Sequence, residues 1–196
     1  DTVQESSELI LSNLERAGEL VQSFKQVAVD QAHLDKRTLN VKEYLEEVLI
    51  SLEPQLKQTS HTLTIDGDET VTIETYPGAI SQVITNLVMN SISHGYQPKQ
   101  NGQLHLQVDR VEEQLMITYH DDGCGIAQDH LGQIFEPFFT TARARGGSGL
   151  GLHIVYNLVT QKLLGQIEVK SQIGKGTEFI ITLPIGCSRR VADRKS

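Results

Sequence analysis

Tryptophan is absent from this chain, cysteine occurs only twice, and no apolar run approaches the length of a membrane-spanning helix. Two cysteines, Cys124 and Cys187, are too few for a disulfide framework and are typical of a reducing compartment. The first residues are acidic and polar and show no signal-peptide pattern. Because the chain begins inside a helical pattern, we expect a fragment of a longer protein, with any sensor or membrane segment upstream.

Positive charge is also scarce. The chain has 17 Lys and Arg against 25 Asp and Glu, which gives a net charge of −8. This balance argues against nucleic acid as the main partner. It does not exclude a nucleotide, because a small site depends on its local field and on its Mg²⁺. With 196 residues the chain is long enough for one good core and an attached helix.

Charge is missing altogether from residues 77–98, which contain no Asp, Glu, Lys or Arg. The pattern predicts a helix over 77–94 with polar side chains at every fourth residue, Gln82, Asn86, Asn90 and His94, on one face. A solvated stripe would carry Lys and Glu, whereas Asn is a poor helix former. The stripe therefore favours a lined cavity. The alternative is a helix covered by loops, with its buried amides satisfied by the backbone.

Two glycine-rich loops, at 121–125 and 147–152, flank a short segment rich in phenylalanine. A glycine lets backbone amides approach an anion closely, because no Cβ is in the way. The second loop leads directly into an apolar helical pattern, so its amides would lie at a helix N-terminus, where phosphate binds favourably. Together the loops predict a nucleotide enclosed between an anchor and a lid.

Two side chains suit particular parts of that nucleotide. An ionised carboxylate at Asp121 only accepts hydrogen bonds, so it complements the N6 amino group of adenine. Guanine has a carbonyl oxygen at the same position, so two acceptors would face each other, at a cost of ~1–3 kcal/mol. Mg²⁺ prefers oxygen ligands and shares the phosphates of its substrate, so one amide oxygen from Asn90 is a sufficient protein ligand.

Residues 1–32 carry a heptad pattern. Their apolar residues step by four and three in alternation: Ile10, Leu14, Ala17, Val21, Phe24 and Ala28. Such a seam is typical of a coiled coil or a helical bundle, so we predict a dimerisation helix. A helix that packs on its own domain is the alternative. A polar linker follows at 33–40.

The remaining residues alternate helices and strand pairs. Asn40 and Glu43 form a capping-box pattern at the start of a helix. We predict three hairpins: 62–65 with 71–75 through Asp66-Gly67-Asp68, 104–111 with 114–119, and 166–169 with 177–183. This order predicts an α+β fold with the architecture of a two-layer α/β sandwich, not a doubly wound parallel sheet. The domain would span 41–185, followed by a flexible tail at 186–196.

These motifs together resemble the catalytic ATP-binding domain of sensor histidine kinases. That domain belongs to the GHKL superfamily, which includes type II topoisomerases, a heat-shock chaperone and mismatch-repair ATPases. The motifs occur in family order: the asparagine box at 82–90, a glycine box at 121–126, the phenylalanine box at 134–139, a second glycine box at 147–152 and a last one at 174–179. The resemblance implies a Bergerat-type ATP-binding fold, a mixed and mainly antiparallel sheet covered on one face by helices. The long N-terminal helix resembles the second helix of the dimerisation and phosphotransfer module.

The resemblance also implies roles for individual residues. Asn86 and Asn90 are expected to be catalytic, and Asn90 is expected to bind the metal. Nucleotide contacts are expected from both asparagines and from His94, Asp121, Gly123, Gly125, Phe135, Arg143, Arg145, Gly147, Gly149, Leu150, Gly151, Leu152 and Thr177.

The chain departs from the family pattern at two cationic positions. Ser93 and Ala142 occupy places where the family often has lysine, so Arg143 and Arg145 are the candidates to supply charge to the γ-phosphate. His33 lacks the acidic neighbour and the proline of a phosphoacceptor motif, so we interpret it as a linker histidine.

The resemblance implies that the chain binds ATP and Mg²⁺ and transfers phosphate to a histidine on a helix absent from this chain. An aspartate of a response-regulator receiver domain would then accept the phosphate. The implied partners are ATP, the protein's own phosphotransfer helix pair, the receiver domain and a second copy bound through the N-terminal helix, but no nucleic acid. The expected location is the cytoplasmic side, and a membrane anchor in the full-length protein is left open.

Three alternatives stay open at this point. An ATP-hydrolysing clamp, as in the topoisomerase and chaperone relatives, activates water with a glutamate four residues before the Mg²⁺ asparagine. Asn86 occupies that position here and cannot act as a base. The other two alternatives are a degenerate module that binds a nucleotide without catalysis, and a serine-directed kinase of the same superfamily.

Overall fold

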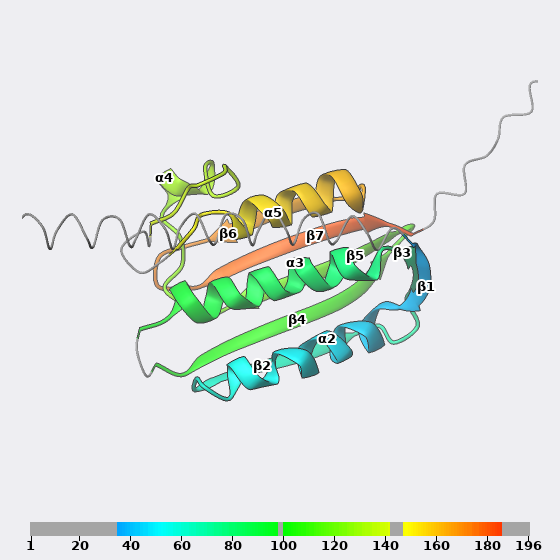
Figure 1. Cartoon of the computed structure of the whole chain (residues 1–196), viewed down its shortest axis with the longest axis horizontal. Helices are drawn as coiled ribbons and strands as arrows, with labels where there is room; N and C mark the ends of the chain where they lie inside the picture. Colours follow the sequence, from blue (N-terminus) through cyan, green and yellow to red (C-terminus); the bar gives the residue numbers. More distant parts are fainter. Residues whose placement is uncertain (1–34, 98–99, 142–146, 186–196) are drawn as a thin grey trace, which may run out of the picture.

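The computed structural model describes residues 35–97, 100–141 and 147–185 (Figure 1). The elements are β1 (Arg37–Asn40), α2 (Val41–Leu56), β2 (His61–Gly67), β3 (Thr72–Thr75), α3 (Pro77–Asn90), η1 (Ser91–Gly95), β4 (Gly102–Val111), β5 (Gln114–Asp121), α4 (Gln128–Leu131), α5 (Gly151–Asn157), η3 (Leu158–Lys162), β6 (Gln166–Ser171) and β7 (Thr177–Pro184). The π-helical turns η1 and η3 directly follow α3 and α5. The predicted N-terminal helix and C-terminal tail lie outside the described residues.

Five strands form the main sheet in the order β2-β4-β5-β7-β6. β2 and β4 are parallel, and the other three neighbouring pairs are antiparallel. The helices α2, α3 and α5 lie side by side over one face of this sheet, as Figure 1 shows. The predicted two-layer sandwich with a mixed, mainly antiparallel sheet is therefore confirmed. Among the described helices, none has both the length and the apolar character that crossing a bilayer requires.

The core lies between the sheet and the helices. Every second residue of β5 is buried, which is the pattern of a strand with one face against a core. The uncharged helix α3 contributes six buried residues: Ala79, Ile80, Val83, Ile84, Leu87 and Val88. It also lies in the connection between the parallel strands β2 and β4, which cannot be joined by a tight hairpin. The absence of charge on this helix thus follows from its central position.

The second and third predicted hairpins are confirmed. β4 pairs with β5 from Leu104↔Asp121 to Val111↔Gln114, and β6 pairs with β7 from Gln166↔Thr182 to Ser171↔Thr177. The predicted helix over 77–94 is present as α3 continued by η1.

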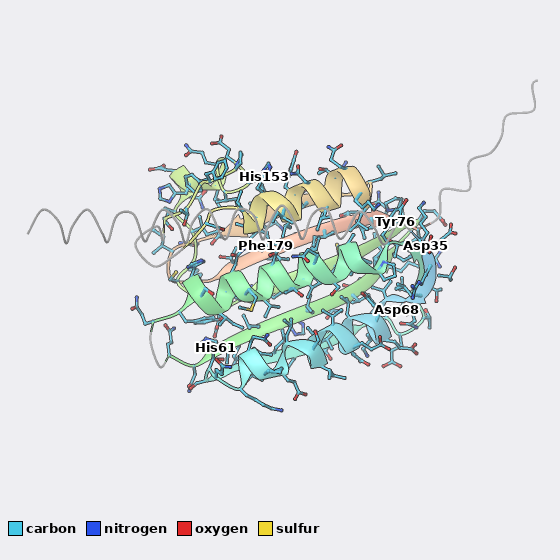
Figure 2. All side chains as sticks on the ribbon, viewed as in Figure 1. Asp35, His61, Asp68, Tyr76, His153 and Phe179 are labelled. Carbon is cyan, nitrogen blue, oxygen red and sulfur yellow. The ribbon has the colours of Figure 1, made fainter. Side chains whose placement is uncertain are left out.

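The first predicted hairpin is wrong. β2 pairs in parallel with β4, and β3 pairs with β1 in a separate two-stranded sheet. The reason is the local structure after β2, where the carboxylate of Asp68 accepts hydrogen bonds from the Thr70 backbone N–H at 2.7 Å and from its hydroxyl at 2.6 Å. This Asx-type turn directs the chain away from β2, so Asp66-Gly67-Asp68 does not fold back on itself. Figure 2 shows Asp68 at the β1 and β3 end of the molecule.

The start of α2 agrees with the sequence pattern. Asn40 is its N-cap and accepts the Glu43 backbone N–H at 3.2 Å. The Asn40 amide also donates to the backbone oxygen of Glu69 at 2.6 Å. The residues before α2, Arg37–Asn40, fall in the predicted linker and form β1. One side chain therefore begins α2 and ties it to the segment before β3.

The N-cap generates a stability prediction. Asn40→Ala removes both hydrogen bonds, so we expect the free energy of unfolding to fall by about 1 kcal/mol. Asn40→Ser keeps an acceptor for the Glu43 N–H and should lose less. Urea unfolding followed by far-ultraviolet circular dichroism measures the difference. An Asn40→Ala midpoint equal to that of wild type would contradict this role.

Candidate functional site

A cavity of about 610 Å³ lies at one end of the helical layer. Its walls come from α3 and η1, from the loops after β5 and before α5, and from β7. The described lining residues are Asn86, Asn90, Ser91, His94, Gly95, Asp121, Cys124, Gly125, Ile126, Ala127, His130, Ile134, Phe139, Thr140, Thr141, Ser148, Gly149, Gly151, Leu152, Ile173, Thr177 and Phe179. This volume is in the range of small-molecule sites.

The polar stripe of α3 reaches this cavity. Asn86, Asn90 and His94 line it, whereas Gln82, one turn earlier, is not among the lining residues. The Asn86 side-chain nitrogen is buried and has no hydrogen-bond partner within the described residues. A buried amide without a partner is costly in a folded protein, so this group has capacity for a ligand or a water. The interpretation of the stripe as a lined cavity is confirmed for three of its four members.

Asn90 lies against the start of α5. A Cβ added at Gly151 would be 3.3 Å from the Asn90 side-chain oxygen and 3.4 Å from its nitrogen. Glycine at position 151 therefore leaves the space that the Asn90 amide occupies. The asparagine box and the second glycine loop thus meet at this point.

Asp121 ends β5 and lies at the cavity wall, with its side chain almost fully buried. One carboxylate oxygen accepts the Gly123 backbone N–H at 3.0 Å, and the other accepts the Ser91 hydroxyl at 2.7 Å. A carboxylate has about four acceptor positions, so two protein donors leave capacity for a ligand donor. Its geometry suits the amino group of a base.

The first glycine loop packs tightly against its neighbours. A Cβ at Gly123 would lie 2.5 Å from the Gly95 backbone oxygen, and Gly125 has a φ of +69° and contacts the Gln172 backbone. The Cys124 backbone N–H donates to the Gly95 oxygen at 2.7 Å. Gly123 and Gly125 are required for the close approach of three backbone segments, and of these two Gly125 also lines the cavity.

Phe135, from the phenylalanine box, packs beside the cavity and not in its lining. Its ring lies 5.3 Å from the Tyr156 ring and 6.4 Å from the Phe179 ring. His153 of α5 hydrogen-bonds the Phe135 backbone oxygen through Nδ1 at 3.0 Å. Because a carbonyl only accepts, Nδ1 carries the proton, and Nε2 accepts from Asn157 at 3.0 Å. Figure 2 shows His153 at α5 and Phe179 below it in the view. The phenylalanine box is thereby fixed to α5.

The apolar half of the cavity was not predicted residue by residue. Six large apolar side chains line it, together with Ala127: Ile126, Ile134, Phe139, Leu152, Ile173 and Phe179. Only Leu152 was an expected contact. Ile173 is 69% exposed although it is large and apolar, which marks a wall that a flat aromatic ligand could cover. The sequence signal that could have identified some of these residues was the apolar alternation of β7 for Phe179 and the phenylalanine box for Ile134 and Phe139.

The expected site residues therefore divide into three groups. Those that line the cavity are Asn86, Asn90, His94, Asp121, Gly125, Gly149, Gly151, Leu152 and Thr177. Gly123, Phe135, Gly147 and Leu150 are described but do not belong to the lining. Arg143 and Arg145 lie outside the described residues.

The described cavity wall has few charged side chains. Among the described lining residues there is no Lys or Arg, and Asp121 is the one carboxylate. The described part of the chain also contains no group of three or more His, Cys, Asp or Glu that could hold a metal ion. A cation bound here would therefore need oxygen ligands from amides, hydroxyls and the ligand itself.

Comparison with known proteins identifies similar chains. Residues 75–186 match the family described as histidine kinase-, DNA gyrase B-, and HSP90-like ATPase. The chain is 40% identical over 132 residues to the autoinducer 2 sensor kinase/phosphatase LuxQ of Vibrio harveyi, which covers 63% of this chain. It is 30% identical over 191 residues to the sensor protein SrrB of Staphylococcus aureus, which covers 94% of this chain.

The fold is also similar to that of a solved structure. The catalytic domain of the histidine kinase ThkA, in a nucleotide-free form, superposes with a TM-score of 0.68 at 25% identity, covering 77% of this chain and 96% of that domain. The chain spans only 15% of the LuxQ sequence and 32% of the SrrB sequence. The likeness is thus to one domain of longer proteins.

The contact between Gly151 and Asn90 generates a second prediction. Gly151→Ala should press a methyl group on the Asn90 amide and weaken ATP binding about tenfold, because overpacking costs about 1–3 kcal/mol. Gly78→Ala, in open space on α3, is the matched control and should bind ATP like wild type. Calorimetric titration with ATP and Mg²⁺ measures both. Equal affinities for the two variants would show that this contact is not part of the site.

Proposed function

The chain belongs to the histidine kinase-, DNA gyrase B-, and HSP90-like ATPase family, and we propose that it is the ATP-binding catalytic domain of a sensor histidine kinase. In this role it positions ATP so that a histidine on a separate helix attacks the γ-phosphorus. The bond from phosphorus to the β-phosphate oxygen breaks, and ADP leaves with the electron pair. The similarity to LuxQ and to the ThkA domain supports this assignment.

The chemistry of the cavity wall is the main observation in favour of transfer over hydrolysis. The described lining contains no glutamate, and its single carboxylate, Asp121, accepts hydrogen bonds through both of its oxygens. A hydrolase needs a base that takes a proton from water. Asn86 lies where the hydrolases of the family have that glutamate, and an amide cannot accept a proton. Phosphoryl transfer needs positioning more than base catalysis, which suits this wall.

The base-binding end would contain adenine. The buried carboxylate of Asp121 would accept the N6 amino group, with Thr177 beside it on the neighbouring strand, since the two residues are register partners. Ile126, Phe139 and Phe179 would cover the flat faces of the ring. A base with a carbonyl at this position would oppose the carboxylate with a second acceptor and bind more weakly.

The phosphates would lie toward Asn86, Asn90 and the second glycine loop. The donor set fits Mg²⁺, because the Asn90 amide is held at the cavity wall against Gly151 and adds a neutral oxygen ligand. When bound, the ion would neutralise charge on the β- and γ-phosphates. Arg143 and Arg145 are the proposed cations of the lid. The segment of the lid with the phenylalanine box would exclude water once the nucleotide is bound.

The remaining assignments extend this proposal to the longer protein. Residues 1–32 would be the second helix of the phosphotransfer helix pair and would dimerise with a second copy. Residues 33–40 would link it to the catalytic domain at 41–185, and residues 186–196 would form a tail. The receiver domain of a response regulator would accept the phosphate next. The domain would then lie on the cytoplasmic side.

Transfer to a supplied acceptor tests the proposal. The chain is incubated with γ-labelled ATP, Mg²⁺ and a phosphotransfer helix pair from a related histidine kinase. We expect acid-labile label on the helix pair, and none when its histidine is replaced by alanine. Asn90→Ala should abolish labelling, because it removes the proposed metal ligand.

The same experiment separates transfer from hydrolysis. Without the helix pair, we expect only slow release of inorganic phosphate. Fast hydrolysis that disappears in Asn86→Ala would overturn the kinase proposal and favour an ATP-driven clamp. Nucleotide binding without either reaction would favour a degenerate binding module.

A further inference from the structure

A chain of buried hydrogen bonds leads from the sheet to Asp121. The Tyr119 hydroxyl donates to the Ser91 hydroxyl at 2.8 Å, and Ser91 donates to one carboxylate oxygen of Asp121 at 2.7 Å. The exposed fractions of these residues are 0%, 5% and 4%. Ser91 is the first residue of η1, directly after Asn90, and Tyr119 and Asp121 lie on the same face of β5.

The direction of this chain is fixed by its two ends. Burial raises the pKa of the Tyr119 phenol well above its usual value, so the phenol keeps its proton and donates a hydrogen bond to Ser91. A serine hydroxyl has one proton, and the carboxylate next to it is an acceptor. Ser91 therefore directs its proton to Asp121. The other carboxylate oxygen accepts the Gly123 N–H at 3.0 Å.

Neither hydroxyl is required by the packing of the core. Tyr119 occupies an inward position of β5, in line with the apolar Leu115 and Ile117. Ser91 is a small residue at a helical position, where an alanine would fill nearly the same space. A buried hydroxyl is costly unless it is hydrogen-bonded, and within the described residues the two hydroxyls bond each other and then Asp121.

We propose that Tyr119 and Ser91 are positioning residues for base recognition, which fix Asp121 as a pure acceptor and so select a 6-amino purine over a 6-oxo purine. This inference rests on the proposed function, because it specifies how the same cavity distinguishes its nucleotide. With the chain intact, the carboxylate cannot rotate to offer a different edge, and a carbonyl at position 6 meets only acceptors. Without the Tyr119 and Ser91 hydroxyls, the Asp121 carboxylate keeps the Gly123 N–H as a donor and can rotate.

A simpler alternative is that the two hydroxyls merely satisfy each other within the core. The two accounts differ for the double variant Ser91→Ala/Tyr119→Phe. It replaces Tyr119 and Ser91 by apolar side chains of similar shape, so neither leaves an unpaired hydroxyl, but it removes the donor to one buried oxygen of Asp121. We therefore expect a folded domain with a lower melting temperature. The alternative predicts unchanged nucleotide selectivity in this variant. Positioning predicts a loss of selectivity without a loss of the fold.

The experiment measures dissociation constants for ATP and for inosine triphosphate, which has a carbonyl at position 6, by calorimetry with Mg²⁺. We expect wild type to prefer ATP by roughly tenfold to hundredfold. The double variant should lose most of this preference, mainly by weaker ATP binding. Ser91→Thr keeps a hydroxyl at this position and should retain the preference. Tyr44→Phe is the matched control, since it removes a tyrosine hydroxyl that bonds the Pro77 backbone oxygen at 2.9 Å, away from Asp121.

The outcomes separate this inference from the proposed function. A double variant that still unfolds cooperatively and keeps the full preference for ATP would overturn the positioning role, while ATP binding by the domain would stand. If the double variant does not fold, the single variant Tyr119→Phe decides the question. We expect its preference for ATP over inosine triphosphate to fall, and an unchanged preference would overturn the positioning role. If wild type binds neither nucleotide, the proposed function fails and the inference fails with it.

Discussion

The carboxylate of Asp121 joins the parts of this domain that form its site. Its residue ends β5, where the backbone pairs with Leu104 on one side and Thr177 on the other. Its side chain binds Ser91 at the end of α3 and the backbone of the first glycine loop. A buried charge is tolerated only where hydrogen bonds compensate its lost hydration, so each of these partners constrains where the others lie. The position of the cavity follows from this one group.

The helix α3 covers the sheet with its apolar residues and lines the cavity with its polar ones. Its apolar residues cover the centre of the sheet, which explains the absence of charge. Three members of its polar stripe, Asn86, Asn90 and His94, line the cavity at one end, and the stripe contains no Asp, Glu, Lys or Arg. In the proposed complex, this stripe would supply neither a cation for the triphosphate nor a carboxylate base for water, so a metal ion and the lid would compensate the charge. The same uncharged helix therefore contributes to the core and, in the proposed function, to the nucleotide site.

Much of this could be predicted from the sequence, for reasons that differ between elements. The stripe of α3 and the glycine loops were predictable because period and residue type both point to one face and one kind of ligand. The pairing of β2 was not, because alternation identifies a strand but not its partner. An Asx-type turn at Asp68 and a parallel neighbour far along the chain replaced the expected hairpin. The hydrogen bond between Tyr119 and Ser91 could not be predicted for the same reason, because a tyrosine in a strand and a serine in a helix meet only when the elements pack. Phe135 shows the reverse case, since its motif was found but its ring packs on Tyr156 and Phe179 beside the cavity.

The central claim is that ATP lies in this cavity with adenine on Asp121 and its phosphates toward Asn90. The most direct measurement is a crystal structure of the chain with Mg²⁺ and a non-hydrolysable ATP analogue. The account predicts the N6 nitrogen within about 3 Å of an Asp121 oxygen and the metal in contact with the Asn90 amide oxygen. An analogue bound with its base elsewhere, or with its phosphates at the Asp121 end, would contradict the account.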